Sequence, residues 1–192
     1  MKPRRRGLKF AVGVAAVLVA GWFVYATVKI VSPAQGDLNK RVDAVVSLAP
    51  QYYRLPMAQQ LVSDGVADTL AISYFDHDTS RIPVDGTQDP VPLSQHCELD
   101  HVVCFRPADA TAGEADALAE IARDESWTSL TVVTNQHHVF RTRFIFERCV
   151  GDEVDINVVY AQRDYGLGET ARRVVYENAA FFKAFYDVTF RC

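Results

Sequence analysis

The sequence predicts an α/β fold, a parallel sheet of about five strands with helices on both faces, preceded by one transmembrane helix. Short apolar runs alternate along the chain with stretches whose apolar residues recur at helical spacing. Most connections between them are short, as in sheets built from strand–helix–strand units. The third observation is a charge-free stretch near the N-terminus, which is long enough to cross a bilayer.

The N-terminal part divides into a basic tail, residues 1–9, and an apolar segment, residues 10–31, which we interpret as a membrane anchor. Residues 10–28 carry no charge and would span roughly 28 Å as a helix. Trp22 and Tyr25 lie near the outer end, where aromatic residues favour the membrane interface. Because the basic end stays in the cytoplasm, we expect a single-pass protein with its C-terminal domain outside. The alternative is a cleaved signal peptide, whose apolar core usually has only about 7–15 residues.

The part beyond the anchor is acidic and carries all four cysteines. Six of the 20 Lys and Arg residues precede residue 35, which leaves 14 against 24 acidic residues, a formal charge of −10. We therefore expect no nucleic-acid partner. Outside the membrane an even number of cysteines favours disulfides, of which we prefer Cys97 with Cys104 and Cys149 with Cys192. The alternative is four buried free thiols, and the spacing does not fit a zinc site.

The domain, residues 42–192, begins after a polar linker at residues 32–41. We expect its first strand at residues 43–48, where "DAVVSL" is mostly apolar. A helix follows at residues 54–64, with its apolar residues on one face and a glycine after its end. We expect Pro56 in the first turn of this helix, where a proline removes no hydrogen bond.

The middle of the domain contains two further strands and a helix. The apolar run "TLAIS" predicts a strand at residues 69–73. Residues 76–100 are polar and contain prolines, so we expect a loop there. The run "HVVCF" predicts a strand at residues 101–105, and a helical pattern follows at residues 111–124.

The last part repeats the alternation of strand and helix. We expect strands at residues 129–134 and 154–160 and helices at residues 136–150 and 169–186. The final helix is rich in aromatic side chains, which we expect in the core. The alternative is that they form an exposed patch that docks on a membrane protein or on lipid. The side chains concerned are Phe181, Phe182, Phe185 and Tyr186.

The stretch "VTNQHHVFR", residues 133–141, marks the place where the fourth strand passes into a helix. Ligands bind beyond the carboxyl ends of the strands in such sheets. If the helix begins near Asn135, then His138 and Arg141 share one face near its N-terminus, where the dipole attracts an anion and keeps the imidazole neutral. Arg141 would then hold a carboxylate or phosphate through two hydrogen bonds. The alternative is that Asn135 is only an N-cap and the histidines lie on the surface.

Other polar residues have both a structural and a functional interpretation. Thr111 and Glu114 fit a capping box, although Glu114 is also a candidate acid, base or partner for His138. Arg54 either begins a helix in solvent or points into the cleft. The segment "DHD" at residues 76–78 lacks the glycine and glutamate of a calcium loop, so we interpret it as a solvated loop. Because dinucleotide, Walker, serine-hydrolase and zinc-protease motifs are missing, we expect neither a metal nor a cofactor.

Taken together, these segments resemble the bacterial family of YdcF, SanA and ElyC. The family pattern runs from an Asp-led strand through an Arg-x-x-x-Ala helix, a strand ending in Ser and a Thr-x-x-Glu segment to Val-Thr-x-x-x-His-x-x-Arg. The resemblance covers roughly residues 43–165, and its last segment is the most specific part. The residues in these places are Asp43, Arg54, Ala58, Ser73, Thr111, Glu114, Val133, Thr134, His138 and Arg141.

The resemblance implies a Rossmann-like fold at the bacterial cytoplasmic membrane and a role in cell-wall precursor or lipid-carrier metabolism. It implies no settled reaction, although YdcF itself is associated with S-adenosylmethionine. This chain departs from the family where its turns after the first two strands lack glycine, which lets a backbone approach a phosphate closely. Our candidate catalytic residues are His138 and Glu114. Our candidate ligand-binding residues are Arg141, Thr134, Asn135, Thr111, Arg54 and Ser73.

Two functional hypotheses follow from the sequence. In the first, the chain is an envelope protein that binds a small anionic ligand and, if it is an enzyme, hydrolyses or transfers it. His138 would be the acid or base, Glu114 its partner and Arg141 the anion clamp. In the second, it is a non-catalytic scaffold or sensor with a vestigial cleft, which the missing glycines favour.

Overall fold

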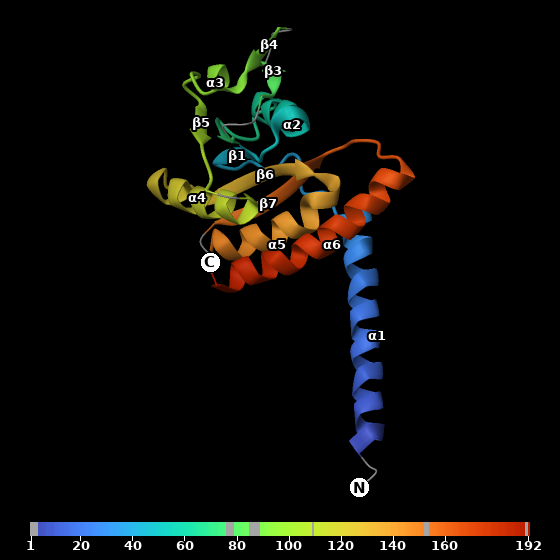
Figure 1. Cartoon of the computed structure of the whole chain (residues 1–192). Helices are drawn as coiled ribbons and strands as arrows, with labels where there is room; N and C mark the ends of the chain where they lie inside the picture. Colours follow the sequence, from blue (N-terminus) through green and yellow to red (C-terminus); the bar gives the residue numbers. More distant parts are fainter. Residues whose placement is uncertain (1–3, 76–78, 85–88, 109, 152–153, 191) are drawn as a thin grey trace.

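The fold is known from a computed structural model that describes residues 4–75, 79–84, 89–108, 110–151, 154–190 and 192. Its centre is a five-stranded parallel sheet with the strand order β5-β2-β1-β6-β7, as in Rossmann-like domains (Figure 1). The strands are β1 (Ala44–Ser47), β2 (Thr69–Ser73), β5 (Val102–Phe105), β6 (Ser129–Asn135) and β7 (Asp155–Ala161). All five predicted strands are therefore present, within a residue or two of their expected ends.

The strand order reverses at β1. The chain first builds outward from β1 to β2 and β5, and then returns to place β6 on the other side of β1. The loops that leave β1 and β6 consequently diverge in opposite directions. In open parallel sheets this divergence leaves a crevice beyond the carboxyl ends of the two strands, where ligands bind.

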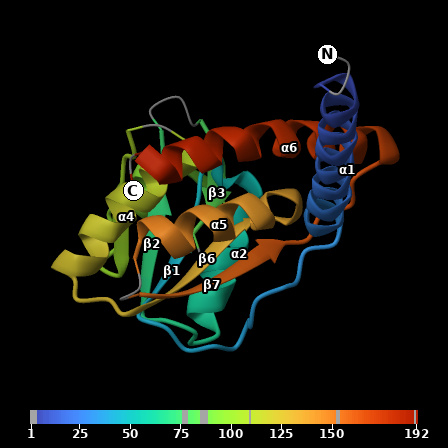
Figure 2. The same cartoon turned by 90° about the horizontal axis from the view of Figure 1, so that it is seen from below.

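Helices cover both faces of the sheet. On one face lies α2 (Gln51–Ser63), and on the other lie α4 (Ala110–Asp124) and α5 (Val139–Cys149). The last helix, α6 (Leu167–Phe190), packs against α5 and forms an outer layer, which Figure 2 shows in front of the sheet. The expected helix at residues 136–150 is divided into a short 3₁₀ turn, η1 (Gln136–His138), and α5.

The two hydrophobic clusters follow from the alternation of side chains along the strands. In β1, Val45 belongs to the cluster beneath α2, with Leu55, whereas Val46 belongs to the cluster beneath α4 and α5, with Leu118 and Phe146. All five of these side chains are fully buried. Fixing both faces of β1 in this way also fixes the position of the loop that follows it.

The N-terminal helix α1 (Arg4–Val31) leaves the domain as a long, solitary rod (Figure 1). Its segment Lys9–Val31 is long and apolar enough to cross a membrane, a test that a signal sequence also passes. Only its last turns contact the domain, where Ala26 and Ile30 are buried beside Val174 of α6.

The segment expected to be a loop at residues 76–100 is partly structured, so that prediction was wrong. Its described part contains an antiparallel pair, β3 (Arg81–Pro83) and β4 (Pro90–Pro92), followed by the short helix α3 (Leu93–His96). Prolines are tolerated in such edge strands because no ladder hydrogen bond is lost. Two apolar residues fix this excursion to the cluster beneath α2, because Ile82 and Leu93 are both buried there.

Two other predictions about helices are corrected. Helix α2 begins at Gln51, three residues earlier than expected, so Pro56 lies inside the helix instead of in its first turn. Phe181 is buried as expected, but Phe182, Phe185 and Tyr186 are exposed. They are exposed because α6 is the outermost layer and only one of its faces packs against α5 and α1.

Both predicted disulfides are present, Cys97–Cys104 and Cys149–Cys192. The first joins the end of α3 to β5, and the second joins the C-terminus to the last residue of α5. Structural disulfides persist in oxidising compartments, which supports a location outside the cytoplasm.

Candidate ligand-binding site

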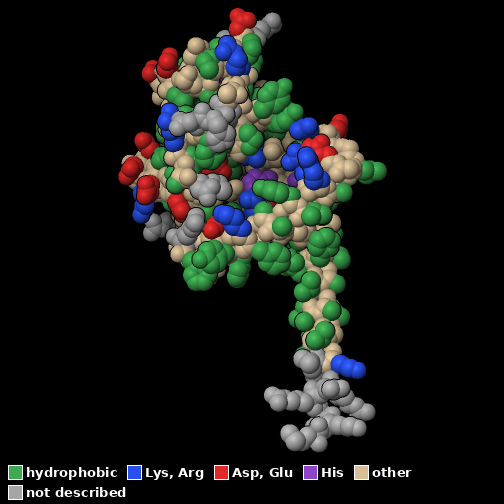
Figure 3. Space-filling model, viewed as in Figure 1, with side chains coloured by type: hydrophobic (Ala, Val, Ile, Leu, Met, Phe, Trp, Pro, Cys, Tyr) green, Lys and Arg blue, Asp and Glu red, His purple; other side chains and the backbone are tan. Residues whose placement is uncertain are grey.

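A recess of about 430 Å³ lies beyond the carboxyl ends of β1 and β6, at the reversal of strand order. Figure 3 shows histidine side chains within a hollow of this face, with Lys and Arg side chains beside it. The lining residues come from the loop after β1, the first turns of α2 and α4, the end of β6 with η1, α5, the loop after β7, and α6. Those used below are Ala49, Tyr53, Arg54, Thr111, Glu114, Asn135, His137, His138, Arg141, Arg163, Arg173 and Glu177.

Glu114 of α4 is a buried carboxylate with neutral hydrogen-bond donors. One of its oxygens, Oε1, accepts hydrogen bonds from the Ser73 hydroxyl at 2.7 Å and from the Ala49 backbone N–H at 2.9 Å. Burial raises the pKa of Glu114 above its usual value, and the bond from Ser73 and the charge of Arg54 only partly oppose this shift. Glu114 can therefore keep a proton at a higher pH than an exposed carboxylate.

Arg54 of α2 is a buried guanidinium at the floor of the recess. Its Nη1 donates a hydrogen bond to the carbonyl of Ala49. Its Nε is buried and has no hydrogen-bond partner among the described residues. Burial lowers the pKa of Arg54 to about 10, so the side chain stays charged near neutral pH. A buried, charged group with an unused donor is a natural contact for an anionic ligand.

His138 lies between Thr111 of α4 and Glu177 of α6, which belong to opposite walls of the recess. Its Nε2 is 3.2 Å from the Thr111 hydroxyl, and its Nδ1 is 3.5 Å from Oε2 of Glu177. Burial and the nearby charge of Arg141 lower the pKa of His138 to about 4. The imidazole is therefore neutral near pH 7, which is the form that accepts a proton. His138 immediately precedes α5 instead of lying in its first turn.

Arg141 of α5 forms a two-pronged ion pair with Glu177 of α6. Its Nε donates to Oε2 at 2.8 Å and its Nη2 donates to Oε1 at 3.2 Å. Burial raises the pKa of Glu177, but the hydrogen bonds and charges of His138 and Arg141 outweigh it and bring the pKa well below its usual value. The arginine predicted to clamp a ligand thus already holds a carboxylate of the protein itself.

Aromatic rings and two more arginines form the mouth of the recess. The guanidinium of Arg163 lies 4.6 Å from the ring centroid of Tyr53 and 5.0 Å from that of Tyr165. Arg173 of α6 lies 4.8 Å from the same Tyr165 ring and pairs with Glu169 at 2.8 Å. Stacking of this kind holds each guanidinium in place while part of its edge stays free for other partners.

His137, next to His138, faces the mouth of the recess. Its ring packs edge-on against that of Tyr165, with centroids 4.5 Å apart. Its Nδ1 is buried without a hydrogen-bond partner in the described part of the chain. Burial lowers the pKa of His137, so this side chain too favours the neutral form.

The structure brings most of the predicted site residues together. His138, Glu114, Arg141, Thr111, Arg54 and Asn135 line the recess, and Ser73 lies behind it as the partner of Glu114. Thr134 is completely buried, and its hydroxyl oxygen accepts a hydrogen bond from Thr142 instead of facing the recess.

Two of the structural alternatives are not found. Thr111 is the second residue of α4 and not its N-cap, so it does not form the capping box with Glu114. Asn135 occupies the position before η1, but its side chain makes no capping hydrogen bond.

Glu177, His137, Arg163 and Arg173 are site residues that the sequence reasoning did not single out. For Glu177 a signal exists, because it lies at helical spacing between Val174 and Phe181, both buried. A charged residue on the apolar face of a helix indicates a buried ion pair. The two arginines have no such signal in the sequence. Arg163, for example, reaches the recess through the loop before α6, which has no regular pattern.

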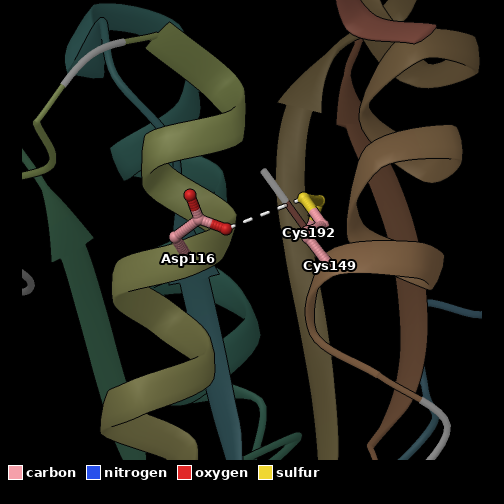
Figure 4. Close-up of side chains that lie close together, drawn as sticks. All are labelled: Asp116, Cys149 and Cys192. Atoms are coloured by element: carbon pink, nitrogen blue, oxygen red, sulfur yellow. Dashed lines mark hydrogen bonds between the residues drawn. A yellow bond between two sulfur atoms is a disulfide. The ribbon is translucent and has the colours of Figure 1, made fainter. Parts of the chain in front are cut away.

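One cluster elsewhere resembles a metal site by distance alone. Asp116, Cys149 and Cys192 have potential ligand atoms within 4.8 Å of one another. Figure 4 shows, however, that the two sulfur atoms are joined in a disulfide. Because metals bind thiolates, this cluster is not a metal site in the oxidised protein. The "DHD" segment at residues 76–78 lies outside the described residues.

No family model, curated protein or solved structure matches this chain. The fold and the recess define it as a Rossmann-like α/β domain with an arginine-lined cavity at the reversal of strand order.

Proposed function

We propose that this chain is a membrane-anchored, extracytoplasmic protein that binds a small anionic ligand in the recess. One observation carries the proposal. Among the described residues, four arginines line the recess, Arg54, Arg141, Arg163 and Arg173, against two carboxylates, those of Glu114 and Glu177. A third carboxylate, that of Glu169, lies beside the mouth and pairs with Arg163 and Arg173, so positive charge still exceeds negative charge by one. The two histidines favour the neutral form and do not alter this balance near pH 7.

The excess of positive charge in the recess contrasts with the acidic character of the domain. The chain after residue 34 has a formal charge of −10, from 14 basic and 24 acidic residues. Arginines gathered in one recess repel one another, and a bound anion would relieve this repulsion. Arginine donors also match the oxygens of carboxylates and phosphates.

Buried polar atoms without a partner indicate where the anion would bind. Nε of Arg54, which can only donate, and the ring nitrogens Nδ1 of His137 and His138 are buried without a hydrogen-bond partner in the described residues. An unmade hydrogen bond of a buried group costs roughly 1–3 kcal/mol. A ligand that accepted a hydrogen bond from Arg54 would remove part of this cost, which favours binding at this position.

The same side chains could support hydrolysis or group transfer. Glu114 has a raised pKa and suits a proton donor, whereas neutral His138 suits a proton acceptor. We propose ligands of cell-wall or lipid-carrier metabolism, in line with the resemblance to the family of YdcF, SanA and ElyC. The apolar helix α1 and the two disulfides support the bacterial cytoplasmic membrane as location, with the domain outside.

The alternative function is a non-catalytic envelope scaffold or sensor with a vestigial cleft. One specific contact favours it. Arg141, the best-placed residue for clamping an anion, already has two hydrogen bonds to Glu177. A ligand would have to displace a buried carboxylate or use the other arginines.

Ligand-dependent thermal unfolding of the full chain in detergent tests the proposal. The panel contains lipid-carrier phosphates, cell-wall precursors, nucleotides and S-adenosylmethionine. A ligand at about 100 times its dissociation constant adds roughly 2.7 kcal/mol to the free energy of unfolding. We expect one class to raise the melting temperature of the parent and of Arg172→Gln, which changes an exposed neighbour, but to do so much less in Arg173→Gln. If no compound shifts the parent, the scaffold hypothesis replaces the binding hypothesis.

A further inference from the structure

Helix α6 has two functional faces, and the outer one is an exposed apolar strip. Phe182 is 65% exposed, Phe185 is 59% and Phe190 is 71%, and Val175 and Tyr186 are similarly exposed. Residues 175, 182 and 186 are separated by seven and four positions, so they lie on one face of the helix. We call these five residues the outer face of α6. Soluble proteins rarely leave so many large apolar side chains together in water.

The outer face lies at the point where the apolar helix α1 joins the domain. Trp22 of α1 packs on Phe181, with ring centroids 5.0 Å apart, and also on Phe140 at 6.3 Å. Tyr25 is in the same aromatic group, 5.9 Å from Phe140. Trp and Tyr favour the boundary between the hydrocarbon core and the polar headgroups. If α1 spans a membrane, this aromatic group fixes the level of the membrane surface.

The figures show that α6 is on the side of the domain from which α1 leaves. In Figure 1, α6 runs along the lower edge of the domain, crossing the direction of α1, and Figure 2 shows it from below in front of the sheet. In Figure 3, hydrophobic side chains gather along this lower edge. The outer face therefore points toward the surface that α1 would enter.

We propose that the outer face of α6 lies in the headgroup region of the outer leaflet, in direct contact with lipid. This inference rests on the membrane anchoring in the proposed function. An amphipathic helix that lies in the membrane plane has aromatic and aliphatic residues on one face and basic residues beside them. Arg172 and Lys183 are exposed on α6 and supply such basic groups, which suit anionic lipid headgroups, although Nζ of Lys183 also pairs with Asp187 at 2.7 Å.

Lipid is a better occupant of the outer face than a second protein, because the outer face is continuous with the aromatic group that includes Trp22. Phe185 of the outer face stacks on Phe144, which contacts Phe181, and Phe181 packs on Trp22, so any occupant at the membrane surface meets both groups. Lipid needs no further component, since α1 already holds α6 at the membrane surface. Linkage to α1 also makes the contact intramolecular, so a modest apolar face suffices for it to persist.

The placement has a consequence for the recess. Arg173 and Glu177 face the recess from the opposite side of the same helix. Only the thickness of one helix, roughly 10–12 Å, would therefore separate the recess from the membrane surface. Ligands would be received at that surface and not from the bulk solution far from it.

Photocrosslinking of the full chain tests the lipid contact. The substitutions Phe182→p-benzoylphenylalanine and Phe185→p-benzoylphenylalanine are made one at a time, and the chain is reconstituted in vesicles of phosphatidylethanolamine and phosphatidylglycerol. The matched control is the same substitution at Tyr52, an aromatic residue of α2 that is 61% exposed on the other side of the sheet. After irradiation, the labelled peptides are examined by mass spectrometry for lipid adducts.

We expect lipid adducts at positions 182 and 185 and none at position 52. Crosslinks to a second copy in vesicles, or to another protein in cell membranes, without lipid adducts would overturn the proposal in favour of a protein partner. Equal lipid labelling at all three positions would also overturn it.

Extraction of the same membranes with alkaline carbonate separates this inference from the anchoring on which it rests. A chain that resists extraction but lacks adducts at position 182 is anchored without lying on lipid. A chain that is extracted has no transmembrane anchor, so both statements fail together.

Discussion

The two walls of the recess each contain one buried glutamate, and the two glutamates have opposite electrostatic properties. On the wall of β2 and α4, Glu114 receives hydrogen bonds from the Ser73 hydroxyl and from the Ala49 N–H, both uncharged donors. On the wall of α5 and α6, Glu177 receives two hydrogen bonds from the charged Arg141. Burial raises the pKa of both, but only for Glu177 do the partners outweigh burial.

The difference teaches that burial alone does not decide the charge of a carboxylate. The decisive factor is whether its hydrogen-bond donors carry a positive charge. Glu177 is a fixed negative charge that neutralises Arg141 and lies 3.5 Å from Nδ1 of His138. Glu114 keeps its proton to a higher pH than an exposed carboxylate. When neighbouring acids have separated pKa values, the one with the raised pKa is the better candidate for proton transfer.

The largest effect is expected from removing the charge of Glu177 on the wall of α5 and α6, which we call the charged wall. The substitution Glu177→Gln leaves the largely buried guanidinium of Arg141 without a counter-charge. Breaking a fully buried pair in this way costs about 3–5 kcal/mol, so we expect a loss at the lower end of that range. The measurement is the free energy of unfolding from denaturant titration of the full chain in detergent. The control, Glu169→Gln, removes a partly exposed i,i+4 partner of Arg173 on the same helix and should cost far less, because solvent screens this pair. Equal losses in the two variants would contradict the distinction.

The second effect concerns His138 and the pH dependence of stability. Its pKa is about 4 in the folded protein and 6.5 for a free histidine, so only the unfolded chain takes up this proton between these values. Stability should therefore fall as the pH falls from 6.5 to 4, by about 3 kcal/mol for two and a half pH units. In His138→Gln this part of the slope should disappear. The same substitution at the exposed His101 should leave the slope unchanged, and a persistent slope in His138→Gln would place its origin elsewhere.

The third effect on stability has the opposite sign and concerns Glu114 on the wall of β2 and α4, which we call the neutral wall because the hydrogen-bond donors to Glu114 are uncharged. The pKa of Glu114 is raised above its unfolded value of 4.5, so the folded protein holds this proton more tightly. Its contribution lowers stability as the pH rises above 4.5, until the folded pKa is passed. Glu114→Gln keeps an oxygen for Ser73 and Ala49 but cannot ionise. The variant should gain stability over the parent as the pH rises from 4.5, as unfolding titrations at several pH values would reveal. A gain toward acid pH would show that the sign is wrong.

The contrast between the walls explains what the sequence could predict. Strands, helices and the parallel sheet follow from local periodicity, which β1, β6 and α4 display within a short stretch of chain. Glu114, His138 and Arg141 also belong to continuous segments with recognisable spacing. The prediction weakens where partners come from distant segments. Glu177 lies 36 residues after Arg141 in the chain, and no local pattern joins them.

Two further misses have the same physical origin. The hairpin of β3 and β4 has prolines and polar residues that indicate a loop, whereas tertiary contacts, among them the burial of Ile82, hold it against the domain. The aromatic residues of α6 indicated a core helix. Whether such a strip is buried depends on the number of layers above it, which periodicity does not contain, and here α6 is the last layer.

The smallest effect sharpens the comparison by changing the neutral wall without touching a charge. Ser73→Ala removes one hydrogen bond to Glu114, which should cost about 1 kcal/mol. Because that bond lowers the pKa of Glu114, its loss should raise the pKa further and extend the decline of stability above pH 4.5 to higher pH. Ser47→Ala is the matched control, since the buried Ser47 hydroxyl donates to Gln51 and not to Glu114. It should have a similar cost but an unchanged pH profile. If both variants altered the profile equally, the pKa of Glu114 would depend on the packing of the whole wall and not on its own donors.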